Sequence, residues 1–173
     1  IQSGSNKILG LMNRKHKVKD YIKIINKLRK IRSDIAISGD FIVGFPGEND
    51  FDFNETLRLC DEIKYAQAFS FKYSKRPGTP ASIKEDVDEN VKSERLLLLQ
   101  SKLSDSQKKF NNQFLSEKIE VLVERKGKKE NQLIGKSPQF QSVVLKGPTR
   151  LIGSTIFVRI LSCKTNTLIG DIL

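Results

Sequence analysis

The chain has few of the residues that build disulfide-bonded or zinc-stabilised proteins, since two of its 173 residues are cysteine and one is histidine. Cys60 and Cys163 are far apart in the sequence, without a C-x-x-C pair, and His16 stands alone. Neither a disulfide framework nor a structural zinc site is indicated, and isolated thiols suit a reducing cytoplasm. Apolar runs as long as a membrane span and a charged-then-apolar leader are also missing. We therefore expect a soluble, globular, cytoplasmic protein.

The length and the first residues predict a piece of a longer protein. A chain of 173 residues suits one domain of moderate size or two small ones. It starts with Ile1 rather than Met and continues directly into Gln2-Ser3-Gly4-Ser5, without a capping segment. We expect that further sequence precedes these residues.

Positive charge is abundant and unevenly placed. The formal net charge is +11, and residues 1–33 hold ten Lys or Arg against one acid, Asp20. Residues 119–173 hold nine Lys or Arg against four acids. Two basic ends favour a polyanionic partner, most often a nucleic acid. A lysine-rich composition with solvated faces is the alternative.

The stretch Ser38–Glu48 organises the first half of the chain. Its apolar run, with Phe41–Val43, predicts a strand buried on both faces, and the following Gly44 and Gly47 predict a sharp turn before a helix. Such strand ends are where α/β folds bind ligands. Asp40 lies inside the run, and a buried carboxylate needs a partner. It either closes a local turn or ion pair, or it binds a ligand.

Apolar spacing predicts the neighbouring elements. We expect helices at 7–12, 19–32 and 51–63, and a strand at 68–73. Cys60 falls in an apolar helix stripe and is predicted to be a buried thiol. Alternation of strands and helices is typical of parallel α/β architecture with right-handed crossovers. The lysine row of the helix at 19–32 is interpreted as a solvated face.

The second half of the chain predicts a long helix and a small barrel. After the break at Arg76–Pro80, Asp88 or a neighbour is expected to cap a helix that reaches about Phe114. Five short β-rich runs then predict a small antiparallel β-barrel of the oligonucleotide-binding type; they are 119–123, 132–135, 143–146, 155–161 and 168–173. Lys126, Lys128 and Lys129 fall in its first hairpin loop and are the candidate RNA-binding residues. Fold alone does not establish that function.

Four motifs occur in order: Gln2–Asn6, Leu11–Arg14, Asp40–Glu48 and Tyr73–Ala81. They resemble the later half of the radical S-adenosylmethionine (SAM) domain of the methylthiotransferases, and the barrel is similar to the TRAM module that ends those enzymes. The resemblance covers essentially the whole chain. It implies that 1–87 is the C-terminal part of an incomplete (β/α) radical SAM barrel, that 88–116 is a connecting helix, and that 117–173 is the TRAM barrel.

The same resemblance implies an activity. The enzymes add a methylthio group to C2 of N6-dimethylallyladenosine beside the anticodon of tRNA, with two 4Fe–4S clusters and S-adenosyl-L-methionine. The run Ala68–Ser74, leading into Arg76–Pro80, favours this branch. Related enzymes instead modify a ribosomal protein or a threonylcarbamoyladenosine, and a non-catalytic RNA-binding protein is the alternative of another class. We expect a monomer that contacts tRNA and no membrane.

The resemblance also assigns cofactor-binding residues. Arg14 would hold the carboxylate of S-adenosylmethionine in bidentate fashion, which a lysine does less well. Asp40 and Gln2 would bind the ribose hydroxyls, and Val43 and Gly44 would offer backbone groups to the adenine. Alternatively, Arg14 is one more exposed cation of a basic stretch, and Gln2 is merely a capping amide.

One departure from the family concerns the metal ligands. The C-x-x-x-C-x-x-C motif, whose thiolates hold the radical-generating cluster, is absent, as are the three cysteines that hold the second cluster. Cys60 and Cys163 replace neither set. We therefore expect no metal ligands and no catalytic residues in these 173 residues, and we expect the chain to be inert alone.

Overall fold

The computed structural model describes residues 1–173, which form two compact units, 1–106 and 107–173. The first unit contains α1 (Asn6–Leu11), α2 (Val18–Ile31), β1 (Ser38–Val43), α3 (Asp50–Ile63), β2 (Gln67–Lys72) and most of α4 (Glu89–Asn112). The second contains β3 (Lys118–Lys126), β4 (Gln132–Lys136), β5 (Ser142–Lys146), the short 3-10 helix η1 (Thr149–Leu151), β6 (Thr155–Cys163) and β7 (Leu168–Ile172). The predicted division at 87 and 116 stays a prediction. None of the helices has the length and apolar composition needed to cross a membrane.

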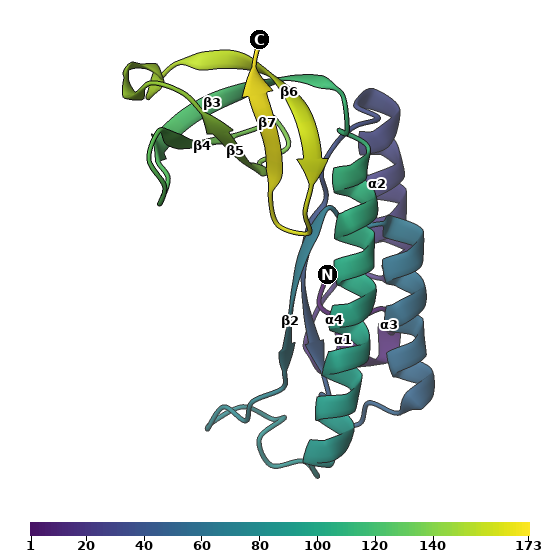
Figure 1. The fold of residues 1–173 in the computed structure, drawn as a ribbon. Coiled ribbons are helices and arrows are strands. Elements are labelled where there is room, and N and C mark those ends of the chain that lie inside the picture. The colour runs from purple at the N-terminus through teal and green to yellow at the C-terminus, as the bar shows by residue number, and fades with distance from the viewer. The chain divides into compact units, whose positions relative to one another are not determined.

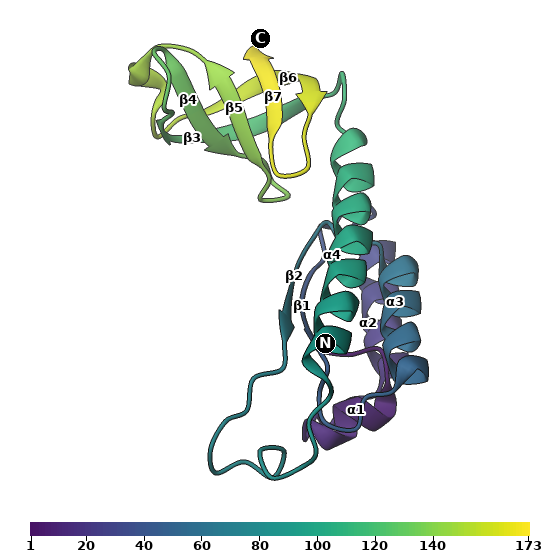
Figure 2. The same cartoon turned by 60° about the horizontal axis from the view of Figure 1, so that its bottom comes forward.

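A parallel sheet forms the centre of the first unit. β1 and β2 pair in parallel from Ser38 opposite Gln67 to Val43 opposite Lys72. The backbone N–H of Ile42 donates to the carbonyl of Gln2 at 3.0 Å, which holds residue 2 beside β1. Figures 1 and 2 show α2, α3 and α4 together on one side of these strands. The predicted α/β architecture is therefore confirmed at this level.

The helix α3 begins and ends where local sequence signals place it. Asn49 accepts a hydrogen bond from the backbone N–H of Asp52, and the Asp52 carboxylate accepts one from the backbone of Asn49. This reciprocal capping box satisfies backbone donors at the helix start. Lys64 ends the helix in the left-handed conformation. The predicted helix at 51–63 is thus confirmed to within one residue.

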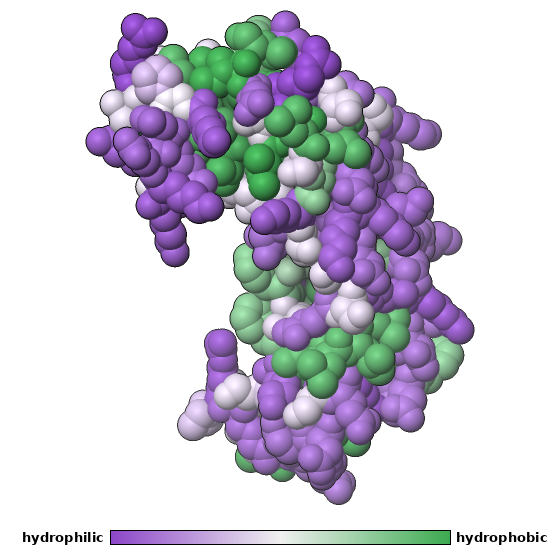
Figure 3. Space-filling model, in the orientation of Figure 1, coloured by the Kyte–Doolittle hydropathy of each residue, from purple (hydrophilic) through white to green (hydrophobic).

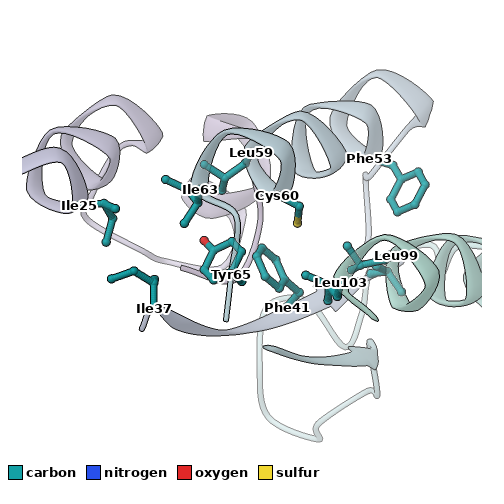
Figure 4. Packing of buried hydrophobic residues seen from close by; sticks show 11 residues of the cluster. Ile25, Ile37, Phe41, Phe53, Leu59, Cys60, Ile63, Tyr65, Leu99 and Leu103 are labelled. Atoms are coloured by element: carbon teal, nitrogen blue, oxygen red, sulfur yellow. The ribbon is translucent and has the colours of Figure 1, made fainter. Parts of the chain in front are cut away.

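The apolar core of the first unit lies between the helices and the covered face of the sheet (Figure 4). Phe41 and Tyr65 pack edge to face with ring centroids 5.3 Å apart. Cys60 is 2% exposed among these side chains, so the prediction of a buried thiol is confirmed. The buried members are Ile25, Ile37, Phe41, Val43, Phe53, Leu59, Cys60, Ile63, Tyr65, Leu99 and Leu103.

The prediction that β1 is buried on both faces is wrong. Phe41 and Val43 are fully buried, but Asp40 is exposed. Its register partner Phe69 is 53% exposed, and Phe71 on the same face is 54% exposed. Helices cover one face of the sheet only, so Asp40 has access to solvent and needs no buried partner. The open face of β1 also carries an apolar residue, Ile42, so the sequence does not show the alternation of apolar and polar residues that would distinguish the two faces.

The second unit is a closed barrel with the strand order β3-β4-β5-β7-β6. The predicted barrel and its five strands are confirmed, but the barrel is not wholly antiparallel, because β5 and β7 pair in parallel where Val143 lies opposite Leu168. Closure requires this pairing, since β7 enters between β5 and β6. Eight buried apolar residues fill the interior. Figure 3 shows further apolar residues on the barrel surface that β6 and β7 form.

Candidate cofactor and RNA sites

The first residues of the chain are anchored to α3. The backbone N–H of Gly4 donates to Oγ1 of Thr56 at 2.9 Å, and Oγ of Ser5 donates to Oδ1 of Asp52 at 2.7 Å. The hydroxyls of Ser3 and Thr56 are 3.3 Å apart. Gly4 lies so close to α3 that a Cβ atom would be 2.3 Å from the carbonyl oxygen of Glu55. These contacts fix the backbone that carries Gln2.

Three of the predicted cofactor-binding residues lie near one another. The charges of Arg14 and Asp40 both act electrostatically at the backbone nitrogen of Ile1. Both side chains are therefore within electrostatic range of residue 1, whose neighbour is Gln2. Arg14 and Asp40 are exposed. A cation and a carboxylate that are 26 residues apart in the numbering thus share one region of the first unit.

Gln2 supplies an unused hydrogen-bond acceptor in this region. Its side-chain Oε1 is buried and has no hydrogen-bond partner within the protein. Buried polar atoms are almost always paired, so an orphan acceptor indicates a missing partner. A ribose hydroxyl is a donor of the right kind. Gln2 and the neighbouring Asp40 therefore fit the sugar of a nucleoside cofactor, and Arg14 fits a carboxylate.

The other two predicted residues are engaged inside the protein. The carbonyl of Val43 accepts from the backbone N–H of Tyr73 at 2.8 Å, and the N–H of Gly44 donates to Oε1 of Glu48 at 2.8 Å. Gly44 has a φ of 70° and lies against Lys92, whose Cγ would be 2.3 Å from a Cβ at this position. These two backbone groups are already used, so the adenine-binding role of Val43 and Gly44 stays a prediction.

A buried ion pair next to the turn at Gly44 was not predicted from the sequence. Nη1 of Arg95 donates to Oε1 of Glu48 at 2.9 Å, and Nη2 donates to Oδ1 of Asp50 at 2.7 Å. The side chains of Arg95 and Glu48 are 7% and 1% exposed. Burial raises the pKa of Glu48, although the Gly44 N–H and the Arg95 guanidinium oppose the rise. The pair holds the turn that carries Gly44, and no local signal links residues so far apart.

The thiols do not fit an iron–sulfur cluster. Burial raises the pKa of Cys60 to about 12, and burial also raises the pKa of Cys163. Cluster ligands are thiolates, which a buried apolar site disfavours. No three His, Cys, Asp or Glu side chains gather in a group able to hold a metal ion.

A groove of about 780 Å³ lies elsewhere on the first unit. Its walls come from α1, α2 and α3 and carry both signs of charge, such as Lys19 and Glu62. Gln2, Arg14 and Asp40 do not line it. The groove therefore does not include the predicted cofactor residues, although Gly4 and Ser5, close to Gln2 in the chain, line it.

The predicted RNA-binding lysines lie at one end of the barrel. Lys128 and Lys129 lie in the β3–β4 loop as predicted, but the placement of Lys126 in the loop is wrong, because it is the last residue of β3. All three are exposed. Oε1 of Gln132 accepts from the backbone N–H groups of Lys128 at 3.0 Å and of Lys129 at 3.3 Å, which orders the loop. Their RNA contact stays a prediction.

Two family models match the two units. Residues 1–60 match the radical SAM superfamily, and residues 113–173 match the TRAM domain. The two matches fall on the two units in the order that the sequence motifs predicted.

Over nearly its whole length the chain is similar to enzymes named tRNA-2-methylthio-N(6)-dimethylallyladenosine synthase. It is 52% identical over 173 residues to the enzyme of Wolbachia pipientis subsp. Culex pipiens, which is 98% of the chain and 39% of that protein. It is 52% identical to the enzyme of Sphingopyxis alaskensis (97% and 38%) and 50% identical to that of Rickettsia rickettsii (100% and 39%). The resemblance to the methylthiotransferases is confirmed, and the chain spans about 39% of the length of these relatives.

Proposed function

We propose that this chain is part of a tRNA-modifying methylthiotransferase, in which it supplies the ribose side of the S-adenosylmethionine site and a barrel that binds tRNA. The main support is sequence identity: about half of the residues, across both units, are identical to those of synthases whose name specifies N6-dimethylallyladenosine in tRNA. The methylthio group would be added to C2 of that adenosine, beside the anticodon. The first unit would then be half of an incomplete radical SAM barrel.

The first unit supports the cofactor part of the proposal. Asp40 and the orphan Oε1 of Gln2 would bind the ribose hydroxyls, and Arg14 would bind the carboxylate. When bound, the cofactor supplies a radical and a methyl group. The two clusters of the family have no fitting ligands among these residues, so their cysteines would have to come from outside the 173 residues. This chain alone would therefore be catalytically inert.

Substitution of Asp40 tests the cofactor site. In the full-length enzyme, Asp40→Ala is expected to weaken S-adenosylmethionine binding about 5- to 100-fold, because a carboxylate that accepts a hydrogen bond contributes about 1–3 kcal/mol. Calorimetric titration of the full-length enzyme measures the effect. Asp20→Ala, at an exposed acid of α2, is the matched control and should leave the dissociation constant unchanged. Equal affinities of the Asp40 variant and the unsubstituted full-length enzyme would remove Asp40 from the site.

The nucleoside profile of tRNA tests the substrate. Cells in which the gene encoding this chain is deleted are expected to lose the methylthio group from prenylated adenosine and to accumulate N6-dimethylallyladenosine. Liquid chromatography with mass spectrometry of digested tRNA measures both nucleosides. An unchanged tRNA profile with a loss of methylthiolation on a ribosomal protein or on threonylcarbamoyladenosine would assign the chain to a related transferase. No change in any of the three would favour a non-catalytic RNA-binding protein.

A further inference from the structure

The β4–β5 loop of the barrel, residues 137–141, presents a phenylalanine to solvent. Phe140 is 79% exposed, and its φ of 63° lies in the left-handed region. A bulky residue there costs roughly 1–2 kcal/mol, and an exposed ring gains nothing from burial. The conformation therefore does not serve the stability of the barrel. Such outliers are a reason to look for a binding role.

The loop holds the backbone of Phe140 in a fixed position. The backbone N–H of Phe140 donates to the carbonyl of Ser137 at 2.9 Å, and Nζ of Lys136 donates to the carbonyl of Phe140 at 3.2 Å. Oγ of Ser137 also accepts from the backbone N–H of Gln141 at 3.2 Å. Ser137 is 5% exposed. Because hydrogen bonds already order the backbone on both sides of Phe140, the loop loses little conformational entropy when a ligand contacts the ring.

A buried asparagine joins this loop to two other segments of the second unit. Asn111 is 2% exposed, and its Nδ2 donates to the carbonyls of Lys164 at 2.9 Å and Thr165 at 2.8 Å in the β6–β7 loop. Its Oδ1 accepts from Nε2 of Gln141 at 2.6 Å. The last turns of α4, the β4–β5 loop and the β6–β7 loop therefore lie at the same end of the barrel.

The charge of these three segments has a single sign. Residues 107–114, 136–142 and 163–167 contain no Asp or Glu and four lysines, which are Lys108, Lys109, Lys136 and Lys164. Lys108, Lys109 and Lys164 are exposed, whereas Lys136 is half-buried. Cations near an exposed aromatic ring are what single-stranded nucleic acids bind, since phosphates pair with the charges and a base stacks on the ring. The ring is flanked by Gln139 and Gln141 rather than by apolar residues, which suits one base better than an apolar protein surface.

We infer that Phe140 stacks on an unpaired base of the RNA substrate, while the surrounding lysines contact its phosphates. This inference rests on the proposed function, in which the barrel binds tRNA, and it names a second contact. β4 separates the two places, because Lys128 and Lys129 precede this strand and Phe140 follows it. The barrel then contacts RNA at both ends.

The affinity of the 173-residue chain for two RNAs tests the stacking contact. One probe is a hairpin with an unpaired loop, and the other is a blunt duplex of the same stem. Phe140→Ala is expected to weaken hairpin binding about 5- to 100-fold and to leave duplex binding unchanged, because only an unpaired base offers its face. Phe140→Leu should weaken binding equally, and Phe140→Trp should retain it. Leu161→Ala, at a 53% exposed position of β6, is the matched control and should bind as the unsubstituted chain does.

The salt dependence of binding distinguishes this inference from the proposed function. Phe140→Ala should leave the slope of affinity against salt unchanged, whereas Lys128→Ala with Lys129→Ala should reduce it. If the unsubstituted chain bound no RNA, the RNA-binding part of the proposed function would fail and the stacking contact with it. If that chain bound RNA and Phe140→Ala bound equally well, the stacking contact alone would be wrong. Hairpin binding retained by Phe140→Leu would also overturn it, in favour of a general apolar contact. Equal thermal unfolding midpoints show that the variants are folded.

Discussion

Replacement of Arg95 by methionine is expected to lower the free energy of unfolding of the first unit by about 3–5 kcal/mol near neutral pH. The substitution removes the cation that faces Glu48, whose side chain is 1% exposed. A carboxylate left without its partner in a buried site carries a large desolvation penalty. Urea denaturation followed by circular dichroism measures the loss. Arg58→Met, which breaks the exposed ion pair between Arg58 and Glu55, is the matched control and should cost less than about 1 kcal/mol.

The loss at Arg95 is also expected to depend on pH. Burial already raises the pKa of Glu48 above its ordinary value of 4.5, and Arg95 opposes that rise. Without Arg95 the pKa rises further, so the folded state binds the proton more tightly than the unfolded state does. The variant therefore regains stability as the pH falls from about 7 toward 5 and loses it again as the pH rises. Glu48→Gln combined with Arg95→Met should restore much of the stability at neutral pH. A loss for Arg95→Met no larger than that for Arg58→Met would contradict the buried-pair argument.

The elements were predictable because their signals are local. The carboxylate of Asp88 accepts from the backbone N–H of Asn90 at 2.8 Å, and the long helix begins where that cap was predicted. Apolar spacing likewise located α3 and the five barrel strands to within a few residues. Strand pairing was harder to predict, because a short β-rich sequence does not specify which strands lie next to it. The parallel contact of Val143 with Leu168 was missed for this reason.

The candidate site, too, was only partly predictable from the sequence. Gln2, Arg14 and Asp40 were named by resemblance to a family, and the structure places them in one region of the first unit. The openness of the Asp40 face was missed, because the sequence of β1 does not show that helices cover only one of its faces. Arg95 was missed because it lies 47 residues from Glu48 in the chain. Long-range polar contacts of this kind leave no periodic pattern.

Gly4 is the second position at which a large effect is expected. Gly4→Ala should lower the free energy of unfolding by about 3 kcal/mol, since its Cβ would lie 2.3 Å from the carbonyl oxygen of Glu55 and 2.6 Å from Cα of Thr56. Both are backbone atoms of α3, so relief requires that residues 1–5 move away from the helix. The hydrogen bond from Gly4 to Thr56 would then be lost, and Gln2 would be displaced with its neighbour. We therefore expect weaker S-adenosylmethionine binding together with the loss of stability.

Two further variants separate the clash from other effects of the Gly4 substitution. Gly10→Ala is the matched control, because nothing lies within 4 Å of the added atom and the residue is inside α1. It should raise stability by about 0.5–1 kcal/mol, as alanine does in a helix. Thr56→Val removes the hydroxyl without adding bulk at residue 4 and should cost about 1–2 kcal/mol. If Gly4→Ala behaved like Gly10→Ala in urea denaturation, the close approach to α3 would not be what requires glycine at this position.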